Sequence, residues 1–255
     1  MNIVSIIPAR MGSSRFPGKP MADILGMPMI GHVYKRVKMS KLLNEVYVAT
    51  CDKEIYDYIE SIGGKSVMTS DRHERCSDRC AEAMLKIEEY ENKKVDIMVM
   101  VQGDEPLTFP EMIDEAVEPM LDDIDMFITN LVADLDTIEE FNDPNEVKVV
   151  MDKNNNALYF SREAIPSRKK SILNVPMKKQ VCVIPFTRDF LLEYNEMTPT
   201  PLEIIESVDM MRILENGMNV KMIETKYITK AVDTSDDLNR VCKMMKDDIL
   251  FKKGY

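Results

Sequence analysis

The sequence contains no tryptophan, no internal repeat and no apolar run long enough to cross a bilayer. Apolar residues nevertheless make up 45% of the 255 residues, so the chain can bury a large core, in which its 22 methionines are suitable fillers. No signal peptide precedes the first expected strand. We therefore expect a globular, cytoplasmic protein that does not span a membrane.

The five cysteines are odd in number and scattered, which is typical of reduced thiols and excludes a disulfide-stapled scaffold. His73, Cys76 and Cys80 lie close enough in sequence to raise the question of a metal site. No fourth ligand is apparent nearby, and Cys76 and Cys80 are one helical turn apart. Thiols in the core or on a helix face are the simpler interpretation.

Basic residues are fewer than acidic residues, 33 against 44, which gives a net charge of −11, and no basic stripe runs along the chain. Nucleic acid is therefore not an expected partner. Residues 1–41 are different, because they carry seven lysines and arginines but a single acid, Asp23. Local positive charge in an acidic protein indicates a specific site for an anion.

Three of these cations lie in a stiff loop, residues 8–20, that follows an apolar strand at residues 3–7. The loop contains three prolines, three cations, two hydroxyls and two glycines: Pro8, Pro17, Pro20, Arg10, Arg15, Lys19, Ser13, Ser14, Gly12 and Gly18. Glycine lets backbone N–H groups approach an anion, which the cations neutralise. We interpret the loop as a triphosphate cradle, with a basic surface loop as the alternative. Its glycines do not form Gly-x-Gly-x-x-Gly, which argues against a dinucleotide-binding oxidoreductase.

Strands and helices alternate through the first half of the chain. Strands are expected at residues 3–7, 45–50, 65–68 and 95–101, and helices at 29–37, 53–62, about 77–91 and 110–121. The run at 95–101 is the most apolar and should be central in a parallel sheet. This order predicts an α/β fold with a doubly wound, mostly parallel sheet flanked by helices.

The middle of the chain departs from this alternation. Strand-like runs at 127–132, 147–151, 158–160 and 181–186 have little helix between them, which predicts a mixed α+β subdomain over residues 126–225. Its strands are expected to pair with the edge of the main sheet. Residues 220–223 are expected to return toward the core, which comprises residues 1–125 and 226–255, and an amphipathic helix at 236–245 should close it. No flexible linker separates these parts, so we expect residues 1–255 to form one compact domain.

Two aspartates are expected at the same sheet edge as the cationic loop. Asp104 follows the central strand in Gln102-Gly103-Asp104-Glu105-Pro106, and Asp233 lies in Val232-Asp233-Thr234. Each could instead serve a helix N-terminus. Together they form a plausible Mg²⁺ clamp, because Mg²⁺ binds carboxylates and phosphate oxygens. Arg10, Arg15 and Lys19 would then offset the charge of a departing pyrophosphate.

The chain resembles the family of 3-deoxy-manno-octulosonate (Kdo) cytidylyltransferases over nearly its full length. The resemblance rests on several segments: Pro8-Ala9-Arg10 through Lys19-Pro20, Val101 through Pro106, Asn145-Glu146-Val147-Lys148-Val149-Val150, Ala157 through Arg162 with Ile165-Pro166, Pro201-Leu202-Glu203, and Val232-Asp233-Thr234. It implies a nucleotidyltransferase-type, Rossmann-like fold, usually homodimeric. It also implies transfer of CMP from CTP to a 2-keto-3-deoxy sugar acid with release of pyrophosphate, the activation step for a lipopolysaccharide sugar.

The resemblance also implies roles for particular residues. CTP is expected to contact Pro8, Ala9, Arg10, Ser13, Ser14, Arg15, Lys19, Gln102 and Gly103. Arg10, Lys19 and Asp104 are the expected catalytic residues, and Asp104 and Asp233 the expected Mg²⁺ ligands. The acidic acceptor is expected to contact Arg79, Gln180, Glu206 and Asp209.

The acceptor half of the sequence departs from the family pattern. The family usually has the segment His-Gln-Ser-Gly-Thr-Asp/Glu-Arg after the third strand. Residues 73–79 replace it here, and Arg75 and Cys76 are new. Gln180 stands where the family has histidine, and Asp209-Met210 where it has Glu-Gln. A site built for specific hydroxyls tolerates such exchanges poorly. A different acidic acceptor, phosphorylated or phosphonate-bearing, is therefore an alternative to Kdo. A non-catalytic nucleotide-binding regulator is a further alternative, which the retained aspartates and cations disfavour.

Overall fold

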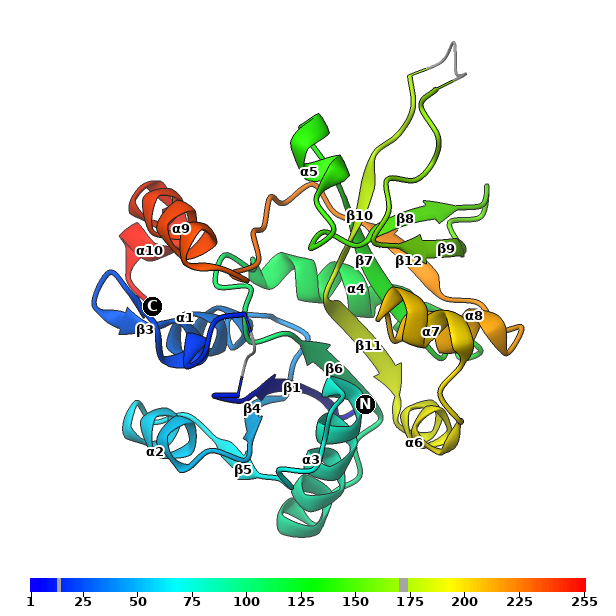
Figure 1. Cartoon of the computed structure of the whole chain (residues 1–255). Coiled ribbons are helices and arrows are strands. Elements are labelled where there is room, and N and C mark those ends of the chain that lie inside the picture. The colour runs from blue at the N-terminus through cyan, green and yellow to red at the C-terminus, as the bar shows by residue number, and fades with distance from the viewer. Residues whose placement is uncertain (13–14, 170–173) are drawn as a thin grey trace.

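Two five-stranded sheets organise the computed structural model, which describes residues 1–12, 15–169 and 174–255 (Figure 1). The first sheet has the order β11–β6–β1–β4–β5. Its strands are β1 (Ile3–Ala9), β4 (Glu45–Thr50), β5 (Ser66–Met68), β6 (Ile97–Val101) and β11 (Val183–Thr187). All neighbours are parallel except β11, which runs antiparallel to β6. The expected mostly parallel α/β sheet is confirmed.

Helices cover both faces of the first sheet. One face carries α1 (Met29–Val37), α2 (Lys53–Ser61) and α4 (Pro110–Asp122), and the other carries α3 (Cys76–Glu91) and α6 (Arg188–Glu196). Successive strand residues alternate between the two faces, so that Ile7 packs with α1 while Ile6 packs with α3. Because both faces are covered, β6 is apolar and buried along its whole length, as its sequence predicts.

The second sheet has the order β12–β7–β10–β8–β9. Its strands are β7 (Thr129–Asp134), β8 (Lys148–Met151), β9 (Ala157–Ser161), β10 (Lys178–Val181) and β12 (Lys221–Glu224), and it is accompanied by α5 (Ile138–Asn142), α7 (Pro201–Glu206) and α8 (Met210–Glu215). A single residue, Cys182, separates β10 from β11, so one extended run passes from the second sheet into the first.

One strand of the predicted subdomain joins the first sheet. β11 falls within residues 126–225 and pairs with β6 at the edge of that sheet, as expected. Residues 220–223 do not return toward the core as expected, because β12 pairs in parallel with β7, with Met222 opposite Asn130. β12 therefore stays in the second sheet, within the bounds of the predicted subdomain.

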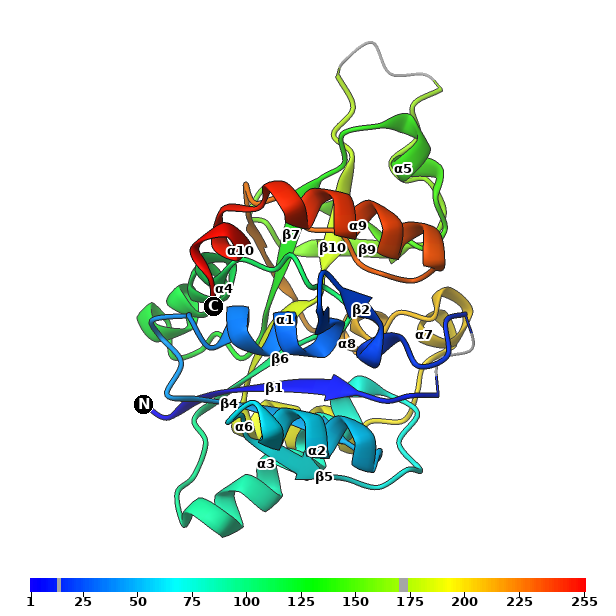
Figure 2. The same cartoon turned by 90° about the vertical axis from the view of Figure 1, so that its left-hand side faces the viewer.

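The C-terminal helices return to the N-terminal part of the chain. α9 (Ser235–Asp247) and α10 (Ile249–Lys253) lie against α1 and the hairpin of β2 (Asp23–Ile24) and β3 (Met27–Pro28), as Figures 1 and 2 both show. Ile24, Val241 and Met245 are fully buried at this contact. The packing places Asp233, which precedes α9, beside the carboxyl edge of the first sheet. Within the described ranges, no helix combines the length and apolarity needed to cross a bilayer.

Candidate functional site

The cationic loop leaves β1 at the carboxyl edge of the first sheet and folds back on itself. Gly18 has a φ of 74°, which favours glycine, and its N–H donates to the carbonyl oxygen of Met11 at 3.0 Å. The N–H of Met11 in turn donates to Asp52, which follows β4, at 2.8 Å. A short 3-10 helix, Lys19–Met21, begins directly after the turn. Ser13 and Ser14, expected to contact CTP, lie outside the described residues.

Lys19 joins the two aspartates that the sequence places at this edge. Its Nζ lies 2.6 Å from Asp104 Oδ2 and 3.2 Å from Asp233 Oδ1, and the three side chains are only 14 to 18% exposed. Arg15 contacts the same Asp233 oxygen at 2.8 Å. Burial alone would lower the pKa of Lys19, but the charges and hydrogen bonds of both carboxylates outweigh burial and raise it. Lys19 is therefore a firmly protonated cation between two carboxylates.

Two adjoining cavities lie over this edge. The first has a volume of about 280 Å³, and its lining includes seven of the residues expected to bind nucleotide: Pro8, Ala9, Arg10, Arg15, Lys19, Gln102 and Gly103. The second has a volume of about 370 Å³ and shares five lining residues with the first: Arg10, Arg15, Cys76, Gln102 and Asp104. Their combined size is typical of a small-molecule site. The structure thus brings the nucleotide half of the expected site together.

Gly103 permits the close approach of the two loops that form the first cavity. A Cβ atom at this position would lie 3.1 Å from the carbonyl oxygen of Pro8 and 3.2 Å from Ile30 Cδ1. Any side chain here would press on the end of β1 and displace Asp104, the next residue.

Asp104 and Asp233 provide a donor set that fits a small, hard cation. They follow different parts of the chain, yet one oxygen of each reaches the same ammonium group. Mg²⁺ is commonly held by one or two carboxylates, with phosphate and water completing its shell. Nowhere in the described ranges do three or more His, Cys, Asp or Glu side chains group to hold a metal. The protein's share of such a site is therefore these two aspartates.

The hypothesis of a metal site at His73, Cys76 and Cys80 is not supported. Cys80 is buried in the core, where its Sγ lies 3.9 Å from the carbonyl oxygen of Ile6, and His73 is hydrogen-bonded to Glu82. Cys76 lies at the start of α3 and lines both cavities. Burial raises the pKa of its thiol to about 12, so Cys76 is a neutral part of the wall.

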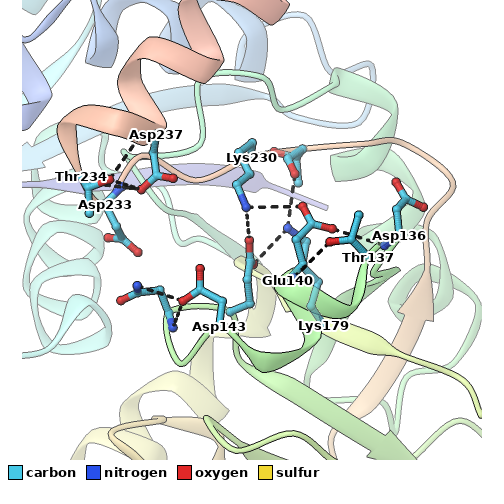
Figure 3. A network of polar contacts seen from close by, with 12 residues as sticks. Asp136, Thr137, Glu140, Asp143, Lys179, Lys230, Asp233, Thr234 and Asp237 are labelled. Carbon is cyan, nitrogen blue, oxygen red and sulfur yellow. Dashed lines mark hydrogen bonds and ion pairs between the residues drawn. The ribbon is translucent and has the colours of Figure 1, made fainter.

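A network of alternating charges includes Lys179, Lys230 and Glu140 (Figure 3), and two of its members, Glu146 and Lys179, line the larger cavity. Glu146 accepts from Lys179 at 3.1 Å and from Lys230 at 2.6 Å, and Lys230 also lies 3.5 Å from Glu140. Burial raises the pKa of Glu146, but the two lysines outweigh it and lower that pKa. Because Lys230 lies three residues before Asp233, this network anchors the segment that carries the second aspartate.

Glu105 continues this network toward the first sheet. It is 7% exposed and accepts a hydrogen bond from the hydroxyl of Thr229 at 2.5 Å. Burial raises its pKa, while the nearby charge of Lys179 opposes that rise. Since Glu105 follows Asp104 directly, both aspartate-bearing segments are tied to the same set of buried charges.

One wall of the larger cavity contains Gln180 and Asp209, two of the four residues expected to contact the acceptor, and we call it the acceptor wall. The amide of Gln180 donates to Asn130 Oδ1 at 2.6 Å. Asp209 Oδ1 accepts from Arg75 Nη1 at 2.5 Å. The new arginine of this sequence therefore lies in the cavity, paired with an acid.

Arg79 and Glu206, the other two residues expected to contact the acceptor, line neither of these two cavities. Arg79 is 3% exposed and donates to the hydroxyl of Thr69 and the carbonyl oxygen of Ser70, which follow β5. It also lines a small cavity of about 70 Å³ together with Arg10, Arg75 and Cys76. Glu206 accepts from the hydroxyls of Tyr159 and Ser161 on β9. Contact of either residue with the acceptor therefore stays a prediction.

Several lining residues have no role assigned from the sequence, among them the four polar residues Asn145, Glu146, Arg162 and Lys179. Three of them lie in segments that carry the family resemblance, which is the signal that could have indicated them. The guanidinium of Arg162 donates to three carbonyl oxygens, those of Pro144, Glu206 and Ser207, and its backbone N–H donates to the Glu206 carboxylate at 3.0 Å. Arg162 therefore holds together the two segments that flank it in the cavity lining.

Known proteins with similar sequences and structures identify the family of this chain. The family model described as "Cytidylyltransferase" matches residues 4–228. A 3-deoxy-manno-octulosonate cytidylyltransferase of Geobacter metallireducens is 40% identical, with 96% of this chain and 98% of that protein covered. One of Trichlorobacter lovleyi is 42% identical, with coverage of 96% and 99%.

A solved structure of CMP:2-keto-3-deoxy-manno-octonic acid synthetase in complex with CTP aligns with a TM-score of 0.88 at 35% identity, covering 97% of this chain and 99% of that one. The match extends through both sheets rather than through the nucleotide half alone. The chain therefore belongs to the family of Kdo cytidylyltransferases.

Proposed function

We propose that this protein transfers CMP from CTP to Kdo, or to a closely related 2-keto-3-deoxy sugar acid, and releases pyrophosphate. The observation that carries the proposal is the convergence of Lys19, Asp104 and Asp233 at the boundary between the two cavities. This convergence supplies cations for a triphosphate and carboxylates for a metal beside a separate space for an acceptor. Full-length relatives named for Kdo support the choice of acceptor.

Mg²⁺ is the proposed cofactor, with Asp104 and Asp233 as its protein ligands. When bound, the ion would draw the phosphates together and withdraw electron density from the α-phosphorus. Both carboxylates already share a cation, so the protein holds them close together before any ligand arrives. Lys19, now held by Asp104 and Asp233, would be free to reach the phosphates once those carboxylates served as metal ligands.

The chain's own cations orient the nucleotide and stabilise the leaving group. Lys19, Arg10 and Arg15 border the first cavity, where they can neutralise the triphosphate. An acceptor hydroxyl in the second cavity attacks the α-phosphorus, and the bond from that phosphorus to the bridging oxygen of the β-phosphate breaks. Pyrophosphate leaves with that oxygen, and the hydroxyl proton passes to solvent. No nucleophilic side chain is needed.

A phosphorylated or phosphonate-bearing acceptor fits the cavity less well. Arg75, the cation of this sequence that could attract a phosphate in the larger cavity, is already paired with Asp209. Arg79 is buried against Thr69 and does not line the larger cavity.

A pyrophosphate-release assay with CTP and Mg²⁺ tests the proposal. Kdo and other sugar acids form one panel, and small phosphorylated acceptors form a second. We expect the highest kcat/KM with Kdo or a close analogue, and no release when the metal is chelated. Absence of release with every sugar acid, despite ordinary CTP binding, would contradict the proposed reaction and favour the non-catalytic alternative.

We also propose that the protein is a homodimer, as the family resemblance implies. Two adjacent isoleucines on α7, Ile204 and Ile205, are 62% and 74% exposed, which leaves apolar surface available for a second copy. Analytical ultracentrifugation should give about twice the chain mass. Ile205→Glu tests whether this surface takes part, since it should shift the species toward the monomer.

A further inference from the structure

The acceptor wall contains a matched pair of opposite charges at the ends of two helices. Arg75 is the residue before α3, and Asp209 is the residue before α8. Their side chains are 27% and 21% exposed, and both line the larger cavity. The pair is close, with Arg75 Nη1 at 2.5 Å from Asp209 Oδ1.

A second ion pair behind the wall completes the charge balance. Glu203 is fully buried and receives two hydrogen bonds of 2.7 Å from Arg212. Arg212 also donates to the carbonyl oxygens of Tyr194 and Met197. Arg75 Nη2 approaches Glu203 only to 3.4 Å. Glu203 is therefore satisfied by Arg212, which leaves Arg75 and Asp209 as a net-neutral pair facing the cavity.

The pair has one hydrogen-bond acceptor and one hydrogen-bond donor without a partner. Among the described residues, Asp209 Oδ2 receives no hydrogen bond and Arg75 Nε makes none. A hydroxyl group can donate to the carboxylate oxygen and accept from the guanidinium at the same time. The neighbouring wall residues Cys76, Cys182 and Met210 offer no competing charge, and exposed Glu74 adds a negative one.

We infer that Arg75, through its pairing with Asp209, is a specificity-determining residue that selects an acceptor with uncharged hydroxyls at this wall and rejects one with a phosphate there. The inference rests on the proposed function and deepens it. A phosphate would meet the Asp209 carboxylate, while the guanidinium that could attract it is already engaged. A hydroxyl meets neither obstacle.

Two substitutions with opposite expectations test the inference. Arg75→Gln removes a charged donor and leaves Asp209 unpaired, so KM for Kdo should rise about tenfold or more while KM for CTP stays unchanged. Asp209→Asn frees the guanidinium, so kcat/KM for the 8-phosphate ester of Kdo, relative to Kdo, should rise about tenfold. A merely structural role cannot produce that gain. Arg188→Gln, which breaks the pair with Glu88 on the other side of α3, should change neither ratio.

The outcomes separate this inference from the proposed function. If the wild type releases no pyrophosphate from CTP and Kdo, the proposed function fails. If the wild type is active but the relative use of the phosphate ester is unchanged in Asp209→Asn, the inference is overturned. It is also overturned if Arg75→Gln raises both KM values equally. Circular dichroism and thermal melting of each variant confirm that it is folded, and either variant alone is decisive.

Discussion

Replacing Lys19 with methionine should destabilise the free protein and make its stability depend on magnesium. The substitution keeps the side-chain volume but removes the cation that Asp104 and Asp233 share at 2.6 and 3.2 Å. The two carboxylates, each less than a fifth exposed, are then left facing each other. Arg15, which is half exposed, still pairs with Asp233 and compensates in part.

The magnitude follows from the burial of the pair. Removing one partner of a fully buried ion pair costs about 3–5 kcal/mol, whereas exposed pairs contribute about 0–1 kcal/mol. With these exposures and with Arg15 in place, we expect a loss of about 1–3 kcal/mol. For a chain of this size, 1 kcal/mol corresponds to about 2–4 °C, so the Tm should fall by about 2–12 °C.

Differential scanning fluorimetry with and without Mg²⁺ measures both effects. In the wild type the ion would compete with the ammonium of Lys19, whereas in the variant Asp104 is unpaired and Asp233 is held by Arg15 alone. Mg²⁺ should therefore raise the Tm of Lys19→Met more than that of the wild type. Turnover should fall about a hundredfold, because a cation next to the triphosphate is lost. Lys41→Met, at an exposed position without an ion pair in the described structure, is the control. An equal response to Mg²⁺ in wild type and Lys19→Met would refute a shared cation site.

Three further predictions concern the same framework. Asp104→Asn and Asp233→Asn should each reduce turnover about a hundredfold or more at saturating Mg²⁺ with little change in circular dichroism, whereas exposed Asp125→Asn should not; near-normal rates in both would exclude the clamp. Gly103→Ala should weaken CTP binding in titration calorimetry, because its Cβ would lie 3.1 Å from a carbonyl oxygen at the end of β1; unchanged affinity would mean that the loop gives way freely. Burial raises the pKa of Glu82, but contacts with Lys86, Ser70 and His73 outweigh it and lower that pKa to about 2. The stability that Glu82 contributes is complete above pH 4.5 and lost as pH falls toward 2. The difference in free energy of unfolding between the wild type and Glu82→Gln, measured with urea, should therefore shrink as pH falls from 5 to 2.5. A constant difference from the wild type across that range would contradict the assignment.

Much of the fold could be predicted because its signals are local. The strand at residues 97–101 is apolar throughout since helices cover both of its faces, and α1 follows the helical spacing of its apolar residues. The partners of short strands are a different matter. β12 has four residues and alternating burial, a pattern that would suit either sheet, and its place beside β7 is decided by tertiary packing.

Some residues of the candidate site could be placed from the sequence and others could not. Asp104 and Lys19 meet because both follow parallel strands of one sheet, and the ends of parallel strands share an edge, so sequence order was sufficient. Arg79 could not be placed in this way, because it faces Thr69 from the first turn of α3 and the direction of that turn depends on β5. Glu206 was equally inaccessible, since its hydroxyl partners lie on β9, more than forty residues earlier.

The internal ion pairs of the site have a consequence for the proposed order of binding. Lys19 and Arg15 resemble free phosphate ligands in the sequence, yet in the structure both are held by Asp104 and Asp233. A triphosphate arriving alone must compete with these carboxylates, and a metal arriving alone must compete with these cations. When CTP and Mg²⁺ arrive together, the phosphates take the cations and the metal takes the carboxylates, so each ligand removes the obstacle to the other. Under the proposed function, the paired charges therefore favour the metal–nucleotide complex over either component.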